Sequence, residues 1–288
     1  MLSERYIELV KTALLNELYI ELEAQLLLSV LCGAEKTVLD LPDFWATRKD
    51  ESLLTALREA KDEGDTVILE TGVSQGKPYA DDTLRNYTEF SYTLVGRRRL
   101  DNLQSCVEQI LQDGVEGDFL EAGVWRGGCC IFLRALLAAY DCTDRSVWVC
   151  DSFQGLPEST LQEDKPFKMS ADRLPFLAVT EDEVRENFQR FKLLDTQVKF
   201  VPGWFSQSLK TAPVERLALL RIDADLYEST MDVLTQLYDR VSSGGWVVID
   251  DYGILPPCKD AVDTFRRERG INEEIQQIDQ HAVCWQVA

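Results

Sequence analysis

The sequence predicts an α/β protein with a mostly parallel sheet covered by helices on both faces, preceded by a helical region. Two observations support this. After about residue 100, short apolar runs typical of strands alternate with amphipathic helical segments. Before that point, helical periodicity dominates. We therefore expect two regions, an N-terminal helical region over 1–100 and an α/β domain over 101–288.

The N-terminal region contains two predicted helices. Ile7, Val10, Leu14 and Leu18 fall on one stripe of a helix that begins near the start of the chain. The segment "ESLLTALREAKDEG" (51–64) predicts a second helix ending at its glycine. The start of the chain alternates charged and apolar residues, which is unlike a signal peptide.

The predicted α/β domain over 101–288 contains five apolar runs with the length and composition of strands. They lie at 118–123, 147–151, 197–203, 216–225 and 245–251. Helices are predicted after three of these strands, at 127–140, 229–241 and 257–269. Two further strands, "EIQQID" and "HAVCWQV", are joined too tightly for a crossover connection. We therefore expect the last strand pair to add an antiparallel edge to the sheet.

Composition excludes several classes of function. The net charge of −20 would repel polyanions, so neither nucleic acid nor an anionic membrane surface is expected as a partner, whereas a cation would be attracted. The eight cysteines include no C-x-x-C pair and are interpreted as thiols of a cytoplasmic protein. His281 is the single histidine, which disfavours both zinc enzymes with histidine ligands and Ser-His-Asp hydrolases.

The stretch "LEAGVWRGG" follows one predicted strand and begins a helix, which is a place where ligands approach the backbone. A dinucleotide fold needs a second glycine where this chain has Trp125, which argues against NAD. Asp151 ends the next strand, where it can accept hydrogen bonds from ribose hydroxyls, and Glu121 would face a ligand ammonium group. S-adenosylmethionine fits these features; a plain turn with a solvated aspartate is the alternative. The expected cofactor contacts are Glu121, Gly123, Gly127, Asp151 and Ser152.

Four acids follow the last two strands of the parallel sheet, in "LLRIDADLYEST" and "WVVIDDYG", with no Lys or Arg adjacent to them. Asp223, Asp250 and Asp251 come from neighbouring strand ends, so their carboxylates can meet on one Mg²⁺ or Ca²⁺ ion. Without a cation, three uncompensated carboxylates would raise one another's pKa. The alternative is that these acids cap a turn and the helix after 229.

Asp225 stands two residues after Asp223, and residues two apart on an extended strand point the same way. We therefore expect both side chains to share one pocket. A metal ion lowers the pKa of a bound hydroxyl, and a nearby carboxylate such as Asp225 can then take the proton.

These segments resemble the macrocin O-methyltransferase family, which methylates sugar hydroxyls on natural products. The matching stretches are "RRRLDNLQSCVEQILQDGVEGDFLEAGVWRGG", "VWVCDSFQGLP", "VKFVPGWFSQSL", "LALLRIDADLYESTMDVLTQLY" and "GGWVVIDDYG". The resemblance implies a class I methyltransferase sheet, S-adenosylmethionine, Mg²⁺ and a small-molecule acceptor. It also implies Asp223, Asp250 and Asp251 as metal ligands and Asp225 as general base. For the two regions of the chain, it implies that 1–100 shapes the acceptor site and that 101–288 is the catalytic domain that binds S-adenosylmethionine. The segment 21–98 matches less well.

Several features leave alternatives open. The acceptor is a sugar hydroxyl or, alternatively, a polyketide, peptide or aromatic hydroxyl or a carboxylate, and a non-catalytic binding protein is a further alternative. The loop 152–176 has no clear periodicity and is interpreted as a lid over the acceptor or as a surface insertion. Trp204 and Phe205 are expected either to contact the adenine of the cofactor or to pack in the core. The amphipathic N-terminal helix indicates a homodimer or a higher homo-oligomer.

Overall fold

The computed structural model describes residues 2–24, 51–63, 90–159 and 161–288. It consists of two compact units. One comprises Glu8–Arg98, and the other comprises Met1–Ile7 and Arg99–Ala288. Within the described residues, no helix is long and apolar enough to span a membrane. The cysteines at described positions carry thiols and form no disulfide with one another, as predicted, and Cys32 lies outside these positions.

The larger unit is built on a seven-stranded sheet within the described chain, with the order β3-β2-β1-β4-β5-β7-β6. The strands are β1 (Asp118–Ala122), β2 (Val147–Asp151), β3 (Val198–Pro202), β4 (Leu217–Ile222), β5 (Val241–Ile249), β6 (Gln276–Gln277) and β7 (Val283–Gln286). The first five are parallel, whereas β7 runs antiparallel to both β5 and β6. The prediction of a mostly parallel sheet with an antiparallel edge is therefore confirmed.

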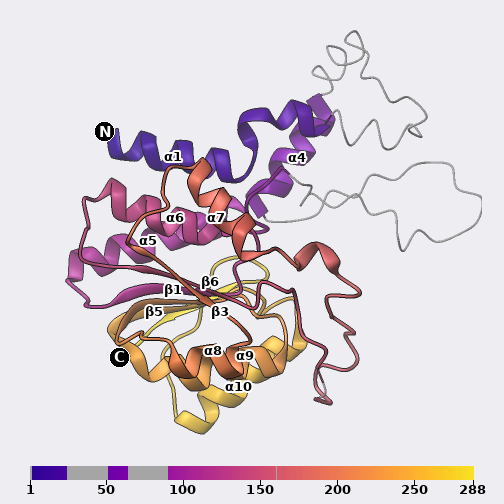
Figure 1. Cartoon of the computed structure of the whole chain (residues 1–288), viewed down its shortest axis with the longest axis vertical. Helices are drawn as coiled ribbons and strands as arrows, with labels where there is room; N and C mark the ends of the chain where they lie inside the picture. The colour runs from indigo at the N-terminus through magenta and orange to yellow at the C-terminus, as the bar shows by residue number, and fades with distance from the viewer. Residues whose placement is uncertain (1, 25–50, 64–89, 160) are drawn as a thin grey trace, which may run out of the picture. The chain divides into compact units, whose positions relative to one another are not determined.

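Helices cover both faces of this sheet (Figure 1). On one face lie α5 (Arg97–Asp113), α6 (Gly128–Ala139) and α7 (Glu181–Arg190), and on the other lie α8 (Phe205–Thr211), α9 (Tyr227–Leu237) and α10 (Pro256–Arg269). Two short 3₁₀ turns, η2 (Pro175–Leu177) and η3 (Tyr238–Arg240), complete the unit. Because both faces are covered, β4 is buried along its whole length, which matches its nearly continuous apolar sequence.

The strand order reverses direction between β1 and β4. From β1 the chain proceeds outward through β2 to β3, and it then returns to the other side of β1 to form β4 and β5. Ligands of open α/β sheets bind beyond the carboxyl ends of the strands at such a reversal. This topology therefore marks the ends of β1 and β4 as the place to look for a site.

The smaller unit contains most of α1 (Leu2–Leu14), together with η1 (Glu17–Tyr19) and α4 (Glu51–Glu63). Ile7, Val10 and Leu14 are buried as predicted, but Leu18 is 47% exposed. The expectation for Leu18 is wrong because α1 ends at Leu14 and Asn16 adopts a left-handed conformation with φ of 58°, which breaks the helical stripe. Inside this unit the buried Lys61 ammonium forms an ion pair with Glu23 at 2.8 Å.

Candidate active site

The carboxyl ends of the central strands lie along one edge of the sheet. The Asp223 N–H donates to the Ala122 carbonyl at 2.8 Å, and the Asp250 N–H donates to the Ile222 carbonyl at 2.9 Å. These bonds hold the first residue after β4 and the first residue after β5 in register with the neighbouring strands. Asp151, the last residue of β2, lies at the same edge.

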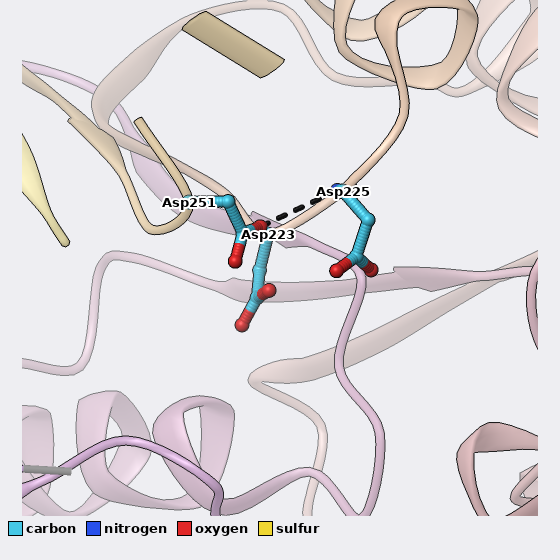
Figure 2. Close-up of side chains that lie close together, drawn as sticks. All are labelled: Asp223, Asp225 and Asp251. Atoms are coloured by element: carbon cyan, nitrogen blue, oxygen red, sulfur yellow. Dashed lines mark hydrogen bonds between the residues drawn. The ribbon is translucent and has the colours of Figure 1, made fainter. Parts of the chain in front are cut away.

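Three carboxylates gather beyond β4 and β5. Asp223, Asp225 and Asp251 each place a carboxylate oxygen within 4.8 Å of the others. Figure 2 shows the three side chains side by side, with the Asp225 backbone N–H donating to Asp251 at 3.3 Å. Clustered carboxylate oxygens are the donor set that Mg²⁺ prefers. The residues in this cluster therefore suit a divalent cation.

The predicted meeting of Asp223 and Asp225 occurs, but the expected geometry is wrong. β4 ends at Ile222, so neither aspartate lies on an extended strand. Asp225 instead adopts a left-handed backbone conformation with φ of 56°. The chain turns sharply after the strand, and this turn, rather than strand alternation, brings the two side chains together.

Asp250 is bound by two arginines. Its Oδ2 accepts from the Arg99 guanidinium at 2.6 Å, and its Oδ1 accepts from Arg221. The side chain is 7% exposed, and Arg221 is 1% exposed. A carboxylate oxygen has two lone pairs, so Asp250 keeps acceptor capacity beside these arginines. Of the three predicted metal ligands, Asp223 and Asp251 thus lie in the three-carboxylate cluster, and Asp250 lies between two guanidinium groups.

The cluster is electrostatically unfavourable without a cation. Desolvation, followed by the charge of Asp250, raises the pKa of Asp223 to about 6. Desolvation, followed by the charge of Asp223, raises the pKa of Asp225 to about 8. The pKa of Asp251 is also raised, chiefly by desolvation and then by Asp225. A bound divalent cation would relieve this repulsion.

Arg221 is a buried counter-ion near the carboxyl end of β4. Its guanidinium binds Asp223 at 3.0 Å, and it also binds Glu121 and Asp250. The other Glu121 oxygen accepts from the Cys130 thiol at 2.8 Å. Desolvation raises the pKa of Glu121 to about 7, although the charge of Arg221 opposes the shift. Both Glu121 oxygens thus have protein partners here, and its contact with a ligand ammonium stays a prediction.

Gly123 connects the glycine turn with the strand that carries the aspartates. Its φ is 86°, and a Cβ at this position would lie 1.6 Å from the Asp223 carbonyl oxygen. Only glycine allows the turn after β1 to pass this close to the end of β4. Trp125, two residues later, has a φ of 46°, so this turn uses a left-handed conformation even at its bulky residue.

Asp151 is held by the backbone of two loops. One oxygen accepts from the Val124 N–H at 2.8 Å, and the other accepts from the Phe153 N–H at 2.8 Å. Desolvation raises the pKa of Asp151, and these backbone bonds oppose the shift. The carboxylate therefore fixes the glycine turn against the end of β2, and its contact with ribose stays a prediction.

The remaining expected cofactor contacts lie around this turn. Gly127 has a φ of 84°, and a Cβ there would lie 2.7 Å from Val184 of α7. The Ser152 hydroxyl donates to the Gly155 carbonyl at 2.8 Å. Phe205 packs against the core, which favours the packing interpretation for this residue.

Several functional candidates were absent from the sequence predictions. Arg221 had a visible signal, because it is a charged residue inside an otherwise apolar strand. Arg99 and Asp164 had none, since their partners lie 151 and 63 residues away in the chain. The expectation that the aspartates are uncompensated is wrong, because Arg221 and Arg99 neutralise part of their charge. Helices α5, α7 and α8 were also not predicted, although the Thr180–Glu183 capping box marks the start of α7.

Comparisons with known proteins identify the family. Residues 3–287 match the family model "Macrocin-O-methyltransferase (TylF)". The chain is 50% identical over 205 residues to demethyldecarbamoylnovobiocin O-methyltransferase from Streptomyces niveus, which covers 70% of this chain and 78% of the relative. It is also 50% identical over 205 residues to mycinamicin III 3''-O-methyltransferase from Micromonospora griseorubida, covering 69% of this chain and 80% of the relative.

A solved structure has the same fold over nearly the whole chain. The O-methyltransferase NovP is 38% identical, with a TM-score of 0.77 and coverage of 99% of each chain. The resemblance inferred from the sequence motifs and the predicted class I methyltransferase fold are both confirmed.

Proposed function

The chain belongs to the macrocin O-methyltransferase family and is an O-methyltransferase, and we propose that it transfers a methyl group from S-adenosylmethionine to a sugar hydroxyl of a natural product. The observation that carries this proposal is the match over residues 3–287 combined with the carboxylate cluster at the ends of β4 and β5. A third relative, from Streptomyces olivaceus, is a rhamnosyl-tetracenomycin C 4'-O-methyltransferase with 49% identity over 222 residues, covering 75% of this chain and 84% of the relative.

The methyl donor is proposed to bind at the turn after β1. The close packing of Gly123 on Asp223 brings this turn beside the carboxylate cluster, as transfer between a donor and an acceptor requires. Asp151 ends β2 at the position where an acid can accept from both ribose hydroxyls. A net charge of −20 favours a cationic sulfonium ligand over a polyphosphate.

The acceptor side is proposed to contain Mg²⁺ held by Asp223, Asp250 and Asp251. When bound, the ion would supply positive charge that lowers the pKa of an acceptor hydroxyl. Asp223 and Asp251 lie within one cluster, which supports their assignment. Asp250 is oriented by Arg99 and Arg221. Asp225 shares the cluster and is the competing candidate for the third ligand.

Asp225 is proposed as the general base. It takes the proton of the acceptor hydroxyl as the oxygen attacks the methyl carbon, the carbon–sulfur bond breaks, and the sulfonium becomes a neutral thioether. A raised pKa suits a group that must accept a proton near neutral pH. A non-catalytic binding protein would have no need of a base at this position.

The decisive experiment uses S-adenosylmethionine carrying a labelled methyl group. The purified chain is mixed with demethyldecarbamoylnovobiocin, mycinamicin III or the demethylated rhamnosyl-tetracenomycin, with Mg²⁺ or with EDTA. We expect label in at least one acceptor, located on a sugar oxygen by mass spectrometry and NMR, and only with Mg²⁺. Label on a non-sugar oxygen would contradict the acceptor class, and full activity in EDTA would contradict the metal role.

The N-terminal region is proposed to shape the acceptor site and to form a homo-oligomer contact. Among the described residues of the smaller unit, Leu9, Leu18, Tyr19 and Leu22 are 41–62% exposed. Light scattering on the purified chain measures the mass. A monomer at micromolar concentration would contradict the oligomer.

A further inference from the structure

The N-terminus of α9 has no cap of its own. The helix begins at Tyr227, and the preceding residue, Leu226, has no side chain able to accept from the first amides. The carboxylate of Asp164 does so instead, although it lies 63 residues earlier in the chain. One oxygen accepts from the Tyr227 N–H at 2.6 Å, and the other accepts from the Glu228 N–H at 3.2 Å.

Asp164 is built into the loop that follows β2. It is 2% exposed, and its Oδ2 also accepts from the Ser159 hydroxyl at 2.8 Å. The positive end of the α9 dipole and two N–H donors favour its negative charge. A buried carboxylate satisfied in this way attaches the loop firmly to α9.

The same contact lies two residues from the proposed base. Asp225 has a left-handed φ of 56°, and such a conformation persists in a non-glycine residue only when the surroundings hold it. On one side, the Asp223 N–H bonds to β1 at 2.8 Å. On the other side, Asp164 holds the amides of Tyr227 and Glu228. The path of the segment that carries Asp225 is therefore fixed at both ends.

The loop has a second attachment on the donor side. The Trp125 indole N–H, in the turn after β1, donates to the Phe176 carbonyl at 2.9 Å. Within the loop, the Ala171 N–H donates to the Leu156 carbonyl at 3.1 Å, and this bond joins the segments before and after Asp164. The loop is thus joined both to the turn proposed for the methyl donor and to the helix that follows the proposed base.

We propose that Asp164 is a positioning residue for methyl transfer: it ties this loop to α9 and thereby sets the position of Asp225 and of the acceptor relative to the donor. The inference rests on the proposed function, because it takes Asp225 as the base. It differs from a simple lid, since protein groups bind the middle of the loop beside the proposed base.

The test compares Asp164→Ala and the milder Asp164→Asn with Asp172→Asn, an exposed aspartate in the same loop. Hydrogen exchange is measured on peptides that contain the Tyr227 and Glu228 amides. We expect faster exchange in both Asp164 variants and wild-type exchange in Asp172→Asn. Unchanged exchange in Asp164→Ala would show that the tie is absent in solution and would overturn the proposal.

The second measurement is steady-state turnover with Mg²⁺ and the acceptor that the wild-type chain methylates, below the unfolding temperature of each variant. Misplacement by about 1 Å can cost on the order of 100-fold, so we expect kcat/KM of Asp164→Ala to fall by about 10- to 100-fold. The Kd of S-adenosylmethionine should stay at the wild-type value. Wild-type kcat and KM with fast exchange would make Asp164 a helix cap only and overturn the proposal.

A third variant guards against unfolding of the first two. Ser159→Ala removes one bond to Asp164 and keeps the carboxylate, so a smaller change in the same direction is expected for exchange and turnover. If the wild-type chain methylates none of the acceptors, the proposed function fails, while the exchange measurement still decides whether the tie exists.

Discussion

Asp151 and Asp225 stand at the same edge of the sheet, yet their carboxylates have very different surroundings. At the end of β2, Asp151 accepts two backbone N–H bonds, and these bonds oppose the rise in its pKa caused by desolvation. Beyond β4, every influence on Asp225 raises its pKa, first desolvation and then the charges of Asp223, Asp250 and Asp151. Backbone N–H groups therefore stabilise the charged form of Asp151, whereas the neighbours of Asp225 favour its protonated form.

Asp250 shows a third arrangement, in which two arginines bind the carboxylate. Arg99 binds Asp250 and also binds Asp279 at 2.7 Å, and Arg221 links Asp250 to Glu121. This buried chain of charges connects the site with helix α5 and with the turn before β7. Asp151 and Asp250 are thus oriented by fixed protein partners, whereas the neighbours of the Asp225 carboxylate disfavour its negative charge.

The largest expected effect comes from Asp225→Asn. The amide keeps the shape of the side chain but cannot take a proton, so turnover should fall by about 10²–10⁴-fold. Added Mg²⁺ should not restore it, because the loss is that of the base. Turnover is measured against Mg²⁺ concentration, with binding of S-adenosylmethionine checked by calorimetry. Restoration by metal would instead assign Asp225 as a ligand and reverse its role with Asp250.

Asp225→Asn, which is expected to lower turnover, is also expected to raise stability in EDTA at high pH. Folding raises the pKa of Asp225 from 3.8 to about 8, so its contribution to stability is present below the lower value and lost as the pH rises through the higher one. At about pH 9 the neutral amide should make the EDTA-treated chain more stable than the wild type. Equal unfolding midpoints in urea at that pH would mean that the carboxylate is well solvated.

Arg221→Met tests the cluster in which Arg221 binds Glu121, Asp223 and Asp250. The substitution leaves the buried Glu121 and Asp250 and the half-buried Asp223 around an uncharged side chain. Breaking a buried ion pair costs about 3–5 kcal/mol of the free energy of unfolding. Arg216→Met is the matched control, since that exposed arginine precedes the same strand and its ion pair with Glu116 contributes about 0–1 kcal/mol. Urea unfolding of both variants gives the two values, and similar losses would contradict the role of Arg221.

Asp223→Asn tests whether Asp223 is a metal ligand rather than a general base. Replacing one oxygen donor should weaken Mg²⁺ binding by at least about tenfold, so activity lost at low Mg²⁺ should return in part at high Mg²⁺. Calorimetric titration of Mg²⁺ into the chain without acceptor gives a readout that does not depend on turnover. An unchanged Mg²⁺ affinity would remove Asp223 from the ligand set.

Asp151→Ala tests the site proposed for the methyl donor. There the Asp151 carboxylate already accepts from two backbone N–H groups. Losing a charged acceptor of hydrogen bonds should weaken S-adenosylmethionine binding by about 1–3 kcal/mol. Asp118→Ala is the control, because Asp118 also accepts two hydrogen bonds, from Ser146 and Trp148, but at the amino end of the sheet. Calorimetry should show weaker binding only for Asp151→Ala, and equal affinities would mean that the ribose is held elsewhere.

The strands and the sheet edge could be predicted from sequence because apolar runs and their order determine the topology. The path of the chain beyond a strand could not. "RIDAD" suggested an extended strand through Asp225, but the strand stops at Ile222 and a left-handed residue follows. The contacts of Asp250 could not be predicted either. Its partner Arg99 lies 151 residues away in the chain, in a helix that the sequence pattern did not predict. Long-range ion pairs leave no local periodicity.

The smallest expected effect concerns the loop 152–176, which spans the donor and acceptor sides. Lys168 and Arg173 are exposed, so trypsin can cut between the attachments at Asp164 and Phe176, whereas Pro166 blocks cleavage after Lys165. Loops with few buried contacts open with little free energy, and ligands bound beneath them oppose opening. We expect slow cleavage of the chain alone and several-fold slower cleavage with S-adenosylmethionine, Mg²⁺ and acceptor together.

The loop is attached at Phe176 to the turn after β1 and at Asp164 to α9, so each ligand is expected to protect a different part of it. S-adenosylmethionine alone should protect the loop only partly, because the donor turn contacts it through Trp125 and leaves the Asp164 side unchanged. Acceptor and Mg²⁺ should add protection beside α9. Mass spectrometry of the fragments locates each cut, and cleavage of an unrelated protein under the same conditions controls for inhibition of trypsin. Equal cleavage rates with and without ligands would leave the loop as a surface insertion and remove it from the comparison between the two sides.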